Sequence, residues 1–225
     1  DTANKIHGLQ IIRGKPKAGE RRRLDKEFWP AGLAKKGHFH LLGLPGDLIL
    51  VAEGYATAAS LYEATGISTV VAFDAGNLAP VCEALRKRYK VARILICADD
   101  DAFSEGNPGV TAASAAALQV GGAFVAPVFA DEAARRLAFE ARGSKLTDFN
   151  DLNALEGLHV VREQVQARLS ALGWSTTARA ARFSATKGEG VPALEPLRPI
   201  ESLDELLERY ALVYGQGGTV FDHQE

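Results

Sequence analysis

The sequence predicts an α/β protein whose core is a parallel sheet of about four strands flanked by helices. From residue 47 onward, short and nearly continuous apolar runs alternate with segments of helical spacing. That alternation is typical of strands buried on both faces and joined by crossover helices. Before residue 47, short apolar patches are separated by Gly, Pro and charge, which favours a small mixed, β-rich N-terminal subdomain.

The core elements follow in order along the chain. The expected strands are the apolar runs at residues 47–54, 68–76, 92–101 and 123–129. The expected helices follow the first three runs, at residues 54–66, 77–90 and 107–122. Gly66 is expected to cap the first helix, Asn77 to begin the second, and Pro108 to lie in the first turn of the third. Right-handed crossovers then place helices on both faces of the sheet, and residues 152–173 add one or two closing helices.

Composition divides the chain into four regions. Residues 1–46 form a basic, β-rich N-terminal subdomain, and residues 47–172 form the main domain. Residues 173–198 have the Ser, Thr, Ala, Gly and Pro content of a linker, and residues 199–225 begin a following region. The chain contains no methionine, so we expect it to be a piece of a longer polypeptide.

The overall composition is that of an ordinary globular protein, with 47% hydrophobic and 24% charged residues. The sequence has no apolar run long enough to span a membrane and no signal-peptide pattern. Cys82 and Cys97 lie far apart and form no CxxC pair, which argues against a zinc site. A reduced, buried Cys97 and a cytoplasmic location are expected.

Charge is unevenly distributed. Residues 1–46 hold ten Lys and Arg against four Asp and Glu, a balance of +6, which leaves −8 for the remainder of a chain of net charge −2. A basic segment beside an acidic body suggests a polyanion bound by one part and metal ions by the other. A solvated hairpin surface explains the basic residues equally well.

Three predicted strands end in carboxylates: Glu53, Asp74, and the run from Asp99 to Asp101. Parallel strands bring these ends to one edge of the sheet, where ligands bind. Side chains alternate along an extended strand, so Asp99 and Asp101 are expected to point away from Asp100. Two such oxygen donors suit Mg²⁺, and a cation relieves the repulsion that raises their pKa values. The alternative is a charged turn.

Two further acidic positions are ambiguous. Asp148 and Asp151 lie close together in TDFNDL and fit either a metal contact or the N-cap of a helix. Asp74 fits a contact to substrate or a strand-to-helix turn. Phe28 and Trp29 fit base stacking or a small core.

The constellation resembles the Toprim domain, the metal-binding catalytic fold of topoisomerases and bacterial-type primases. The matching residues are Glu53-Gly54 and the DxD run Asp99-Asp100-Asp101, within about residues 47–130. Three further motifs are similar to those of Toprim primases from phages, plasmids and integrative elements: EGYATAASLYEATG, CADDD…GNPG and TDFNDL. The LQIIRGKPKAGE…KGHFHLLG pattern resembles the small domain that precedes Toprim in those proteins, where a helicase-like region commonly follows.

The resemblance implies a DNA primase that synthesises primers on single-stranded DNA from nucleoside triphosphates, in mobile-element replication beside a helicase domain or partner. Glu53 is then the general base or acid, or a metal contact, and Asp99 and Asp101 hold Mg²⁺ or Mn²⁺. Asp148 and Asp151 add an acidic contact. The basic residues of the N-terminal region would bind template phosphates; they are Lys15, Lys17, Arg21, Arg22, Arg23, Lys35 and Lys36. Further substrate contacts are assigned to Gly54, Tyr55, Asp74, Asn77 and Asn150.

Two other functions remain open from the sequence: a Toprim metal-dependent nuclease, and a non-catalytic module that binds DNA or a helicase. A topoisomerase is disfavoured because no tyrosine has a recognisable nucleophile context. The stretch between Asp101 and Gly109 is longer than in cellular primases, and this difference favours a mobile-element protein.

Overall fold

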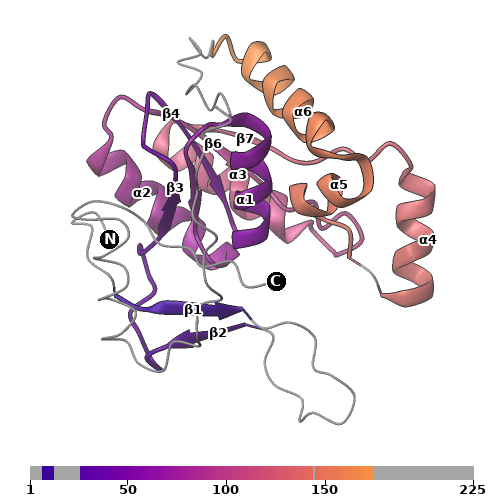
Figure 1. Ribbon diagram of the computed structural model, residues 1–225, viewed down its shortest axis with the longest axis horizontal. Coiled ribbons are helices and arrows are strands. Elements are labelled where there is room, and N and C mark those ends of the chain that lie inside the picture. The colour runs from indigo at the N-terminus through magenta and orange to yellow at the C-terminus, as the bar shows by residue number, and fades with distance from the viewer. Residues whose placement is uncertain (1–6, 13–25, 144, 175–225) are drawn as a thin grey trace, which may run out of the picture. The chain divides into compact units, whose positions relative to one another are not determined.

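The computed structural model describes residues 7–12, 26–143 and 145–174. A five-stranded sheet in the order β3-β5-β4-β6-β7 forms its centre (Figure 1). The strands are β3 (His40–Leu42), β4 (Leu48–Ala52), β5 (Thr69–Val71), β6 (Arg93–Cys97) and β7 (Ala123–Val125). The last four are parallel, and β3 pairs antiparallel with β5. The predicted parallel sheet of four strands is confirmed.

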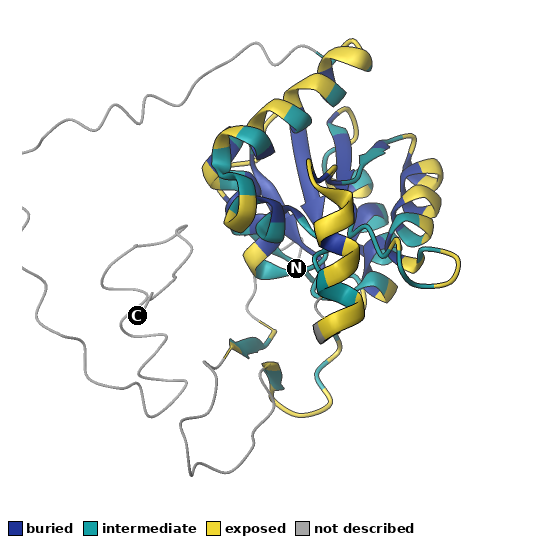
Figure 2. Cartoon of the chain, turned by 90° about the vertical axis from the view of Figure 1, so that its right-hand side faces the viewer, coloured by how far each residue is buried: buried dark blue, intermediate teal, exposed yellow. Residues whose placement is uncertain are grey.

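Helices cover both faces of this sheet, and the strands divide their side chains between them. Leu48, Leu50 and Ala52 of β4 pack in one apolar cluster, whereas Ile49 and Val51 pack in the other. The first cluster includes residues of α1 (Tyr55–Thr65), α5 (Phe149–Glu156) and α6 (Leu158–Ala171), and the second includes residues of α2 (Leu78–Arg88) and α3 (Pro108–Val120). Figure 2 shows the buried strands between helices with exposed outer faces.

The remaining helix, α4 (Glu132–Arg142), lies at the right of Figure 1. It is exposed along most of its length (Figure 2). The sequence of this stretch, DEAARRLAFEAR, begins with a helix-like pattern, and the helix agrees with it. No helix in the described ranges is both long and apolar enough to cross a membrane.

The N-terminal subdomain is smaller than expected. β1 (Leu9–Ile12) and β2 (Lys26–Trp29) form the expected antiparallel pair. His40–Leu42, which the sequence placed with them, is instead the edge strand of the main sheet, because Leu42 is buried against the α1 side of the core. Residues 175–198 of the predicted linker and residues 199–225 lie outside the described part of the chain.

The helix ends agree with the sequence at two positions and differ at a third. Gly66 caps α1 with a left-handed φ of 67°, and Pro108 begins α3. Asn77 precedes α2, but its side chain does not cap that helix. A 3-10 turn, η1 (Ala75–Asn77), comes before α2, and Asp74 caps it by accepting a hydrogen bond from the Asn77 backbone N–H at 2.9 Å.

The Asn77 side chain is buried and joins three backbone segments. Its Nδ2 donates to the carbonyls of Ala72 at 2.8 Å and His38 at 3.0 Å. Its Oδ1 accepts from the N–H of Gly37 at 2.8 Å. Asn77 therefore anchors the loop before β3 to the end of β5, and this structural role replaces the predicted capping role.

We expect Asn77→Ala to lower the free energy of unfolding by about 2–3 kcal/mol, because one buried and two partly buried backbone groups lose their partner. Asn153→Ala is the control, since that half-buried side chain donates one long bond, of 3.3 Å, to Ser60. Urea denaturation followed by circular dichroism measures both variants. Equal losses in the two variants would contradict the anchoring role.

Candidate metal centre at the carboxyl edge of the sheet

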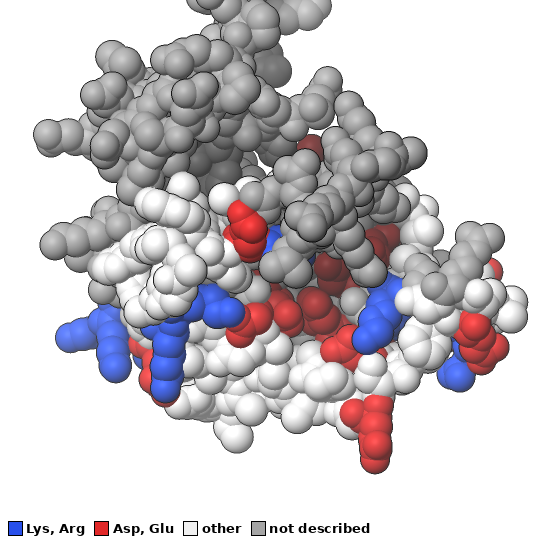
Figure 3. Space-filling model, turned by 90° about the horizontal axis from the view of Figure 1, so that it is seen from below, with Lys and Arg blue, Asp and Glu red and all other residues white. Residues whose placement is uncertain are grey.

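Carboxylates from three parallel strands meet at one edge of the sheet. The backbone register pairs Ala52 of β4 with Cys97 of β6 and with Val71 of β5. Glu53 follows the first of these strands directly, and the run from Asp99 begins two residues after the second. Figure 3, a view from below the orientation of Figure 1, shows acidic side chains gathered at the centre of that face, with Lys and Arg toward its margins.

Asp99 is the most perturbed carboxylate of the group. Its Oδ1 is buried and accepts no hydrogen bond from the described residues. Burial, as the largest cause, and the charges of Glu53, Asp148, Asp101 and Asp151, in that order of influence, together raise the pKa of Asp99 to about 8. Negative charge thus converges on an oxygen that has no donor, which is the environment that a cation stabilises.

Glu53 lies between β4 and α1 and faces the same group. Burial raises the pKa of Glu53, a hydrogen bond from the Ala75 backbone opposes that rise, and Asp74 and Asp101 add to it. The next two residues begin α1, with Gly54 at the N-cap and Tyr55 as the first helical residue. Burial raises the pKa of the Tyr55 hydroxyl.

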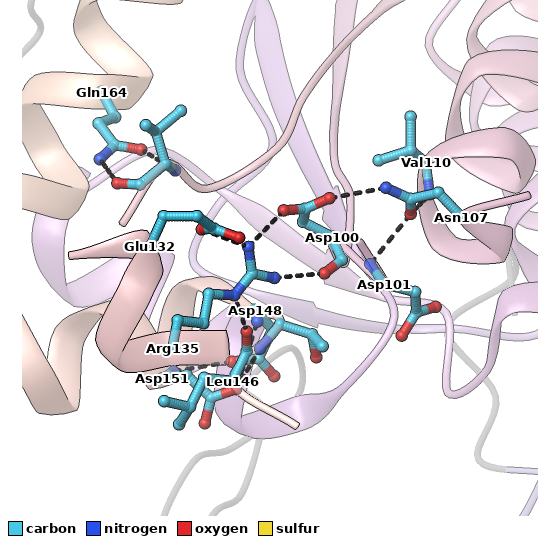
Figure 4. A network of polar contacts seen from close by, with 12 residues as sticks. Asp100, Asp101, Asn107, Val110, Glu132, Arg135, Leu146, Asp148, Asp151 and Gln164 are labelled. Carbon is cyan, nitrogen blue, oxygen red and sulfur yellow. Dashed lines mark hydrogen bonds and ion pairs between the residues drawn. The ribbon is translucent and has the colours of Figure 1, made fainter. Parts of the chain in front are cut away.

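Asp100 makes contacts that separate it from its two neighbours. Its Oδ1 accepts from Asn107 Nδ2 at 2.7 Å, and its Oδ2 accepts from Arg135 Nη1 at 2.7 Å. Its backbone N–H donates to the Thr147 carbonyl at 2.7 Å. Figure 4 shows the contacts of the Asp100 carboxylate with Asn107 and Arg135. Both carboxylate oxygens of Asp100 are therefore engaged by the protein.

The start of α3 stabilises the turn formed by Asp99, Asp100 and Asp101, called here the aspartate turn. Asn107, in the left-handed region with a φ of 42°, accepts from the backbone N–H of Asp101 at 3.0 Å and of Val110 at 3.4 Å. The Gly109 N–H donates to Asp101 Oδ2 at 3.1 Å. A Cβ on Gly109 would lie 2.3 Å from the Asp99 carbonyl oxygen. The roles of Asn107 and Gly109 were not predicted from the sequence, although the Asn-Pro-Gly triplet is a signal for a tight, capped helix start.

Asp148 and Asp151 form a capping box at the start of α5. Asp148 Oδ1 accepts from the Asp151 N–H at 2.8 Å, and its Oδ2 accepts from the Thr57 hydroxyl at 2.7 Å. Asn150 accepts from the Ser60 hydroxyl at 3.1 Å. The helix-cap alternative therefore describes this pair, while the Asp148 charge still acts on Asp99.

Of the described residues predicted to bind phosphates or stack on bases, Lys35 and Phe28 make contacts within the protein. Lys35 forms an ion pair with Asp74 and lies 4.9 Å from the ring centroid of Phe28. Phe28 meets Phe73 edge-on, whereas Trp29 is 46% exposed. Lys36 is exposed. The other predicted phosphate contacts, Lys15, Lys17, Arg21, Arg22 and Arg23, lie outside the described residues.

The donor chemistry of this edge fits a hard divalent cation. Within the described ranges, no group of three or more His, Cys, Asp or Glu side chains is arranged to hold a metal ion by itself. Mg²⁺ does not need such a cage, because it is usually held by one or two carboxylates together with waters and substrate phosphates. The unpartnered Oδ1 of Asp99 and the adjacent carboxylate of Asp101 meet that requirement.

We expect Gly109→Ala to displace the aspartate turn, because the added methyl group overlaps the Asp99 carbonyl. The loss should be about 1–3 kcal/mol of unfolding free energy in urea denaturation. Gly46→Ala is the control, since nothing lies within 4 Å of a Cβ built there. A Gly109→Ala protein as stable as the Gly46→Ala protein would contradict the close packing described here.

Comparisons with known proteins match the part of the chain that contains this edge. The family model of the Toprim domain matches residues 48–158. Two curated Escherichia coli proteins, both described as DNA primase TraC, are 43% and 42% identical over 105 residues, which is 43% of this chain. The chain spans only 10% and 7% of their lengths, and no solved structure matches it. Residues 48–158 of this chain are therefore a Toprim domain.

Proposed function

We propose that this chain carries the catalytic core of a DNA primase, which joins nucleotides into primers on single-stranded DNA with a divalent cation. One observation carries the proposal: the buried, unpartnered Oδ1 of Asp99, with the charges of Glu53, Asp101 and Asp148 directed at it. The similarity of the Toprim region to two proteins described as DNA primase TraC supports this reaction over others.

In this proposal Asp99 and Asp101 hold the ion, Mg²⁺ or Mn²⁺, with Glu53 and Asp148 close enough to contribute negative charge. The bound ion supplies alignment of the incoming triphosphate and neutralises charge on the reacting phosphate. The Gly109 N–H donates to one oxygen of Asp101, and the other oxygen would contact the ion.

Glu53 is proposed as the general base for the attacking 3′-hydroxyl. Burial and the neighbouring carboxylates raise its pKa, and a carboxylate with a raised pKa accepts a proton more readily at neutral pH. Gly54 and Tyr55, at the start of α1, are proposed substrate contacts beside it. Asn150 is a weaker candidate, since its oxygen already bonds Ser60. Asp74 and Asn77 are proposed to shape the rim, because their side chains serve the η1 turn and the loop before β3.

The basic N-terminal residues are proposed to hold template phosphates, in a binding mode that is salt-dependent and blind to sequence. A following helicase-like region or partner, replication of a mobile element and a cytoplasmic location belong to the same proposal. They rest on the resemblance to Toprim primases of phages, plasmids and integrative elements.

We expect Asp99→Asn to stabilise the metal-free protein at about pH 8 by about 1–3 kcal/mol. Because the folded state raises the pKa of Asp99 from 3.8 to about 8, the folded protein binds this proton more tightly than the unfolded chain. The stability that Asp99 contributes is therefore present below about pH 4 and is lost as the pH rises toward 8. Urea denaturation at several pH values in the presence of EDTA measures the difference.

The same variant tests the cation. Mg²⁺ should raise the stability of the wild type much more than that of Asp99→Asn, because a ligand that binds only the folded state stabilises it. Asp47→Asn, an exposed carboxylate before β4, is the matched control. If Asp99→Asn and Asp47→Asn show the same pH dependence and the same response to Mg²⁺, the assignment of Asp99 as the metal-holding carboxylate is wrong.

Primer synthesis on single-stranded DNA, with labelled nucleoside triphosphates and Mg²⁺ or Mn²⁺, tests the reaction. We expect the double variant Asp99→Asn, Asp101→Asn to lose at least about a hundredfold in rate, since both groups that hold the ion are removed. Glu53→Gln should lose activity with its Mg²⁺ response retained, and Glu63→Gln, exposed on α1, is its control. Metal-dependent shortening of the template without primer synthesis would replace the proposal with a nuclease.

A further inference from the structure

Arg135 is a buried arginine on a helix that is otherwise mostly exposed. Its side chain is 3% exposed, whereas its neighbours on α4 face solvent. Removing a guanidinium from water is costly unless its donors are satisfied, and here all three nitrogens donate hydrogen bonds, with Nη1 also bonding the Glu132 carboxylate at 3.2 Å. Nη1 donates to Asp100 Oδ2 at 2.7 Å, Nη2 donates to the Asp100 carbonyl at 2.5 Å, and Nε donates to the Leu146 carbonyl at 2.6 Å.

Aromatic rings hold this guanidinium in place. It lies 4.5 Å from the ring centroid of Phe129 and 5.1 Å from that of Phe103. Phe103 in turn stacks on Phe139 of α4, with ring centroids 5.1 Å apart. The loop after the aspartate run is thus packed on α4 around Arg135. A lysine offers neither the planar stack nor the three donors in a fixed fork.

The contacts converge on the middle residue of the aspartate run. Arg135 binds both the side chain and the carbonyl of Asp100, and that carbonyl belongs to the peptide bond that leads into Asp101. On the other side, Asn107 binds the second carboxylate oxygen of Asp100 (Figure 4), and the Thr147 carbonyl accepts the Asp100 N–H. Rotation of the peptide bond that leads from Asp100 into Asp101 would change the position of the Asp101 side chain relative to Asp99.

We propose that Arg135 is a positioning residue for the metal-holding pair: by fixing Asp100, it aims Asp99 and Asp101 at one cation. This inference rests on the proposed function, because it takes the pair as the metal site. It also gives α4 and the loop at residues 102–107 a role in the site, although neither supplies a metal contact.

A simple charge effect predicts the opposite result, so the two explanations can be separated. Arg135 carries a positive charge near the carboxylates, and removing that charge alone would strengthen the binding of a cation. If Arg135 acts by positioning, its removal weakens cation binding instead. Partners that orient metal ligands from behind typically change metal affinity by about 10–100-fold.

The test is a Mn²⁺ titration of the 225-residue chain followed by electron paramagnetic resonance, which reports free Mn²⁺ without requiring activity. We expect Arg135→Met to weaken Mn²⁺ binding by about tenfold or more, and Arg135→Lys to restore part of the loss. The control is Arg136→Met at the next position. Arg136 is exposed and also lies over Phe103, 5.1 Å from its ring centroid, but it has no hydrogen bond to Asp100 in the described residues, so its loss should change binding by less than about threefold.

A double-variant comparison assigns the effect to Asp100. In an Asp100→Asn background, Arg135→Met should cost much less than it does alone, because the partner is already weakened. Circular dichroism confirms that each variant is folded. If Arg135→Met does not fold, Arg135→Lys and Asp100→Asn carry the test. Both keep a polar side chain of similar length, and both should weaken Mn²⁺ binding.

Unchanged or tighter Mn²⁺ binding in folded Arg135 variants would overturn the positioning role. The proposed function fails in a different way. Wild-type protein would then bind Mn²⁺ no better than the double variant Asp99→Asn, Asp101→Asn, and the Arg135 variants would show no difference because no site exists to be positioned.

Discussion

Repulsion among carboxylates at the carboxyl edge of the sheet is the constraint to which the rest of the site responds. Parallel β4, β5 and β6 end at the same edge and bring Glu53, Asp74 and the aspartate run together. The protein offsets part of this charge itself, with Lys35 beside Asp74 and Arg135 beside Asp100. Asp99 differs, because its buried Oδ1 accepts no hydrogen bond from the described residues. A divalent cation is the partner that this oxygen fits.

Of the three consecutive aspartates, Asp100 stabilises the turn, whereas Asp99 and Asp101 are the candidate metal contacts. Asp100 is bound by Asn107 and Arg135 and holds the turn. Asp101 is oriented by the Gly109 N–H, while Asp99 is left to face the surrounding negative charge. The outer pair can share one ion only if the turn between them is rigid, and the contacts of Asp100 supply that rigidity. In the proposed site, a residue that does not touch the ion would thus govern how well it is bound.

Much of the core could be predicted because apolar periodicity reports burial directly. The strands β4, β5, β6 and β7 belong to a sheet that helices cover on both faces. Because side chains on both sides of each strand are buried, the sequence of each run is apolar throughout. The edge strand β3 was harder to assign, since a three-residue strand beside glycines reads like a hairpin. Asn77 was misassigned as a cap because propensity does not reveal a side chain that turns inward to bond Ala72 and His38.

The site shows the same limit. Strand ends marked Glu53 and the aspartate run, because carboxylates after apolar strands are visible in one dimension. Arg135 carried no such signal. It lies 35 residues from Asp100, and its neighbour Arg136 has the same chemistry in the sequence. Only packing shows which of the two is buried against Phe129. The contact of Gly109 with the Asp99 carbonyl is likewise a fact of three-dimensional approach.

Proton release on cation binding tests the central claim most directly. Asp99 has a pKa of about 8, so it is mostly protonated at neutral pH and must lose that proton to hold a metal ion. Calorimetry of Mg²⁺ binding at about pH 7, in buffers of different ionisation enthalpy, counts the protons released. We expect close to about one proton per ion in the wild type and almost none in Asp99→Asn. Cation binding without proton release, or equal release in both proteins, would contradict the claim that Asp99 holds the ion.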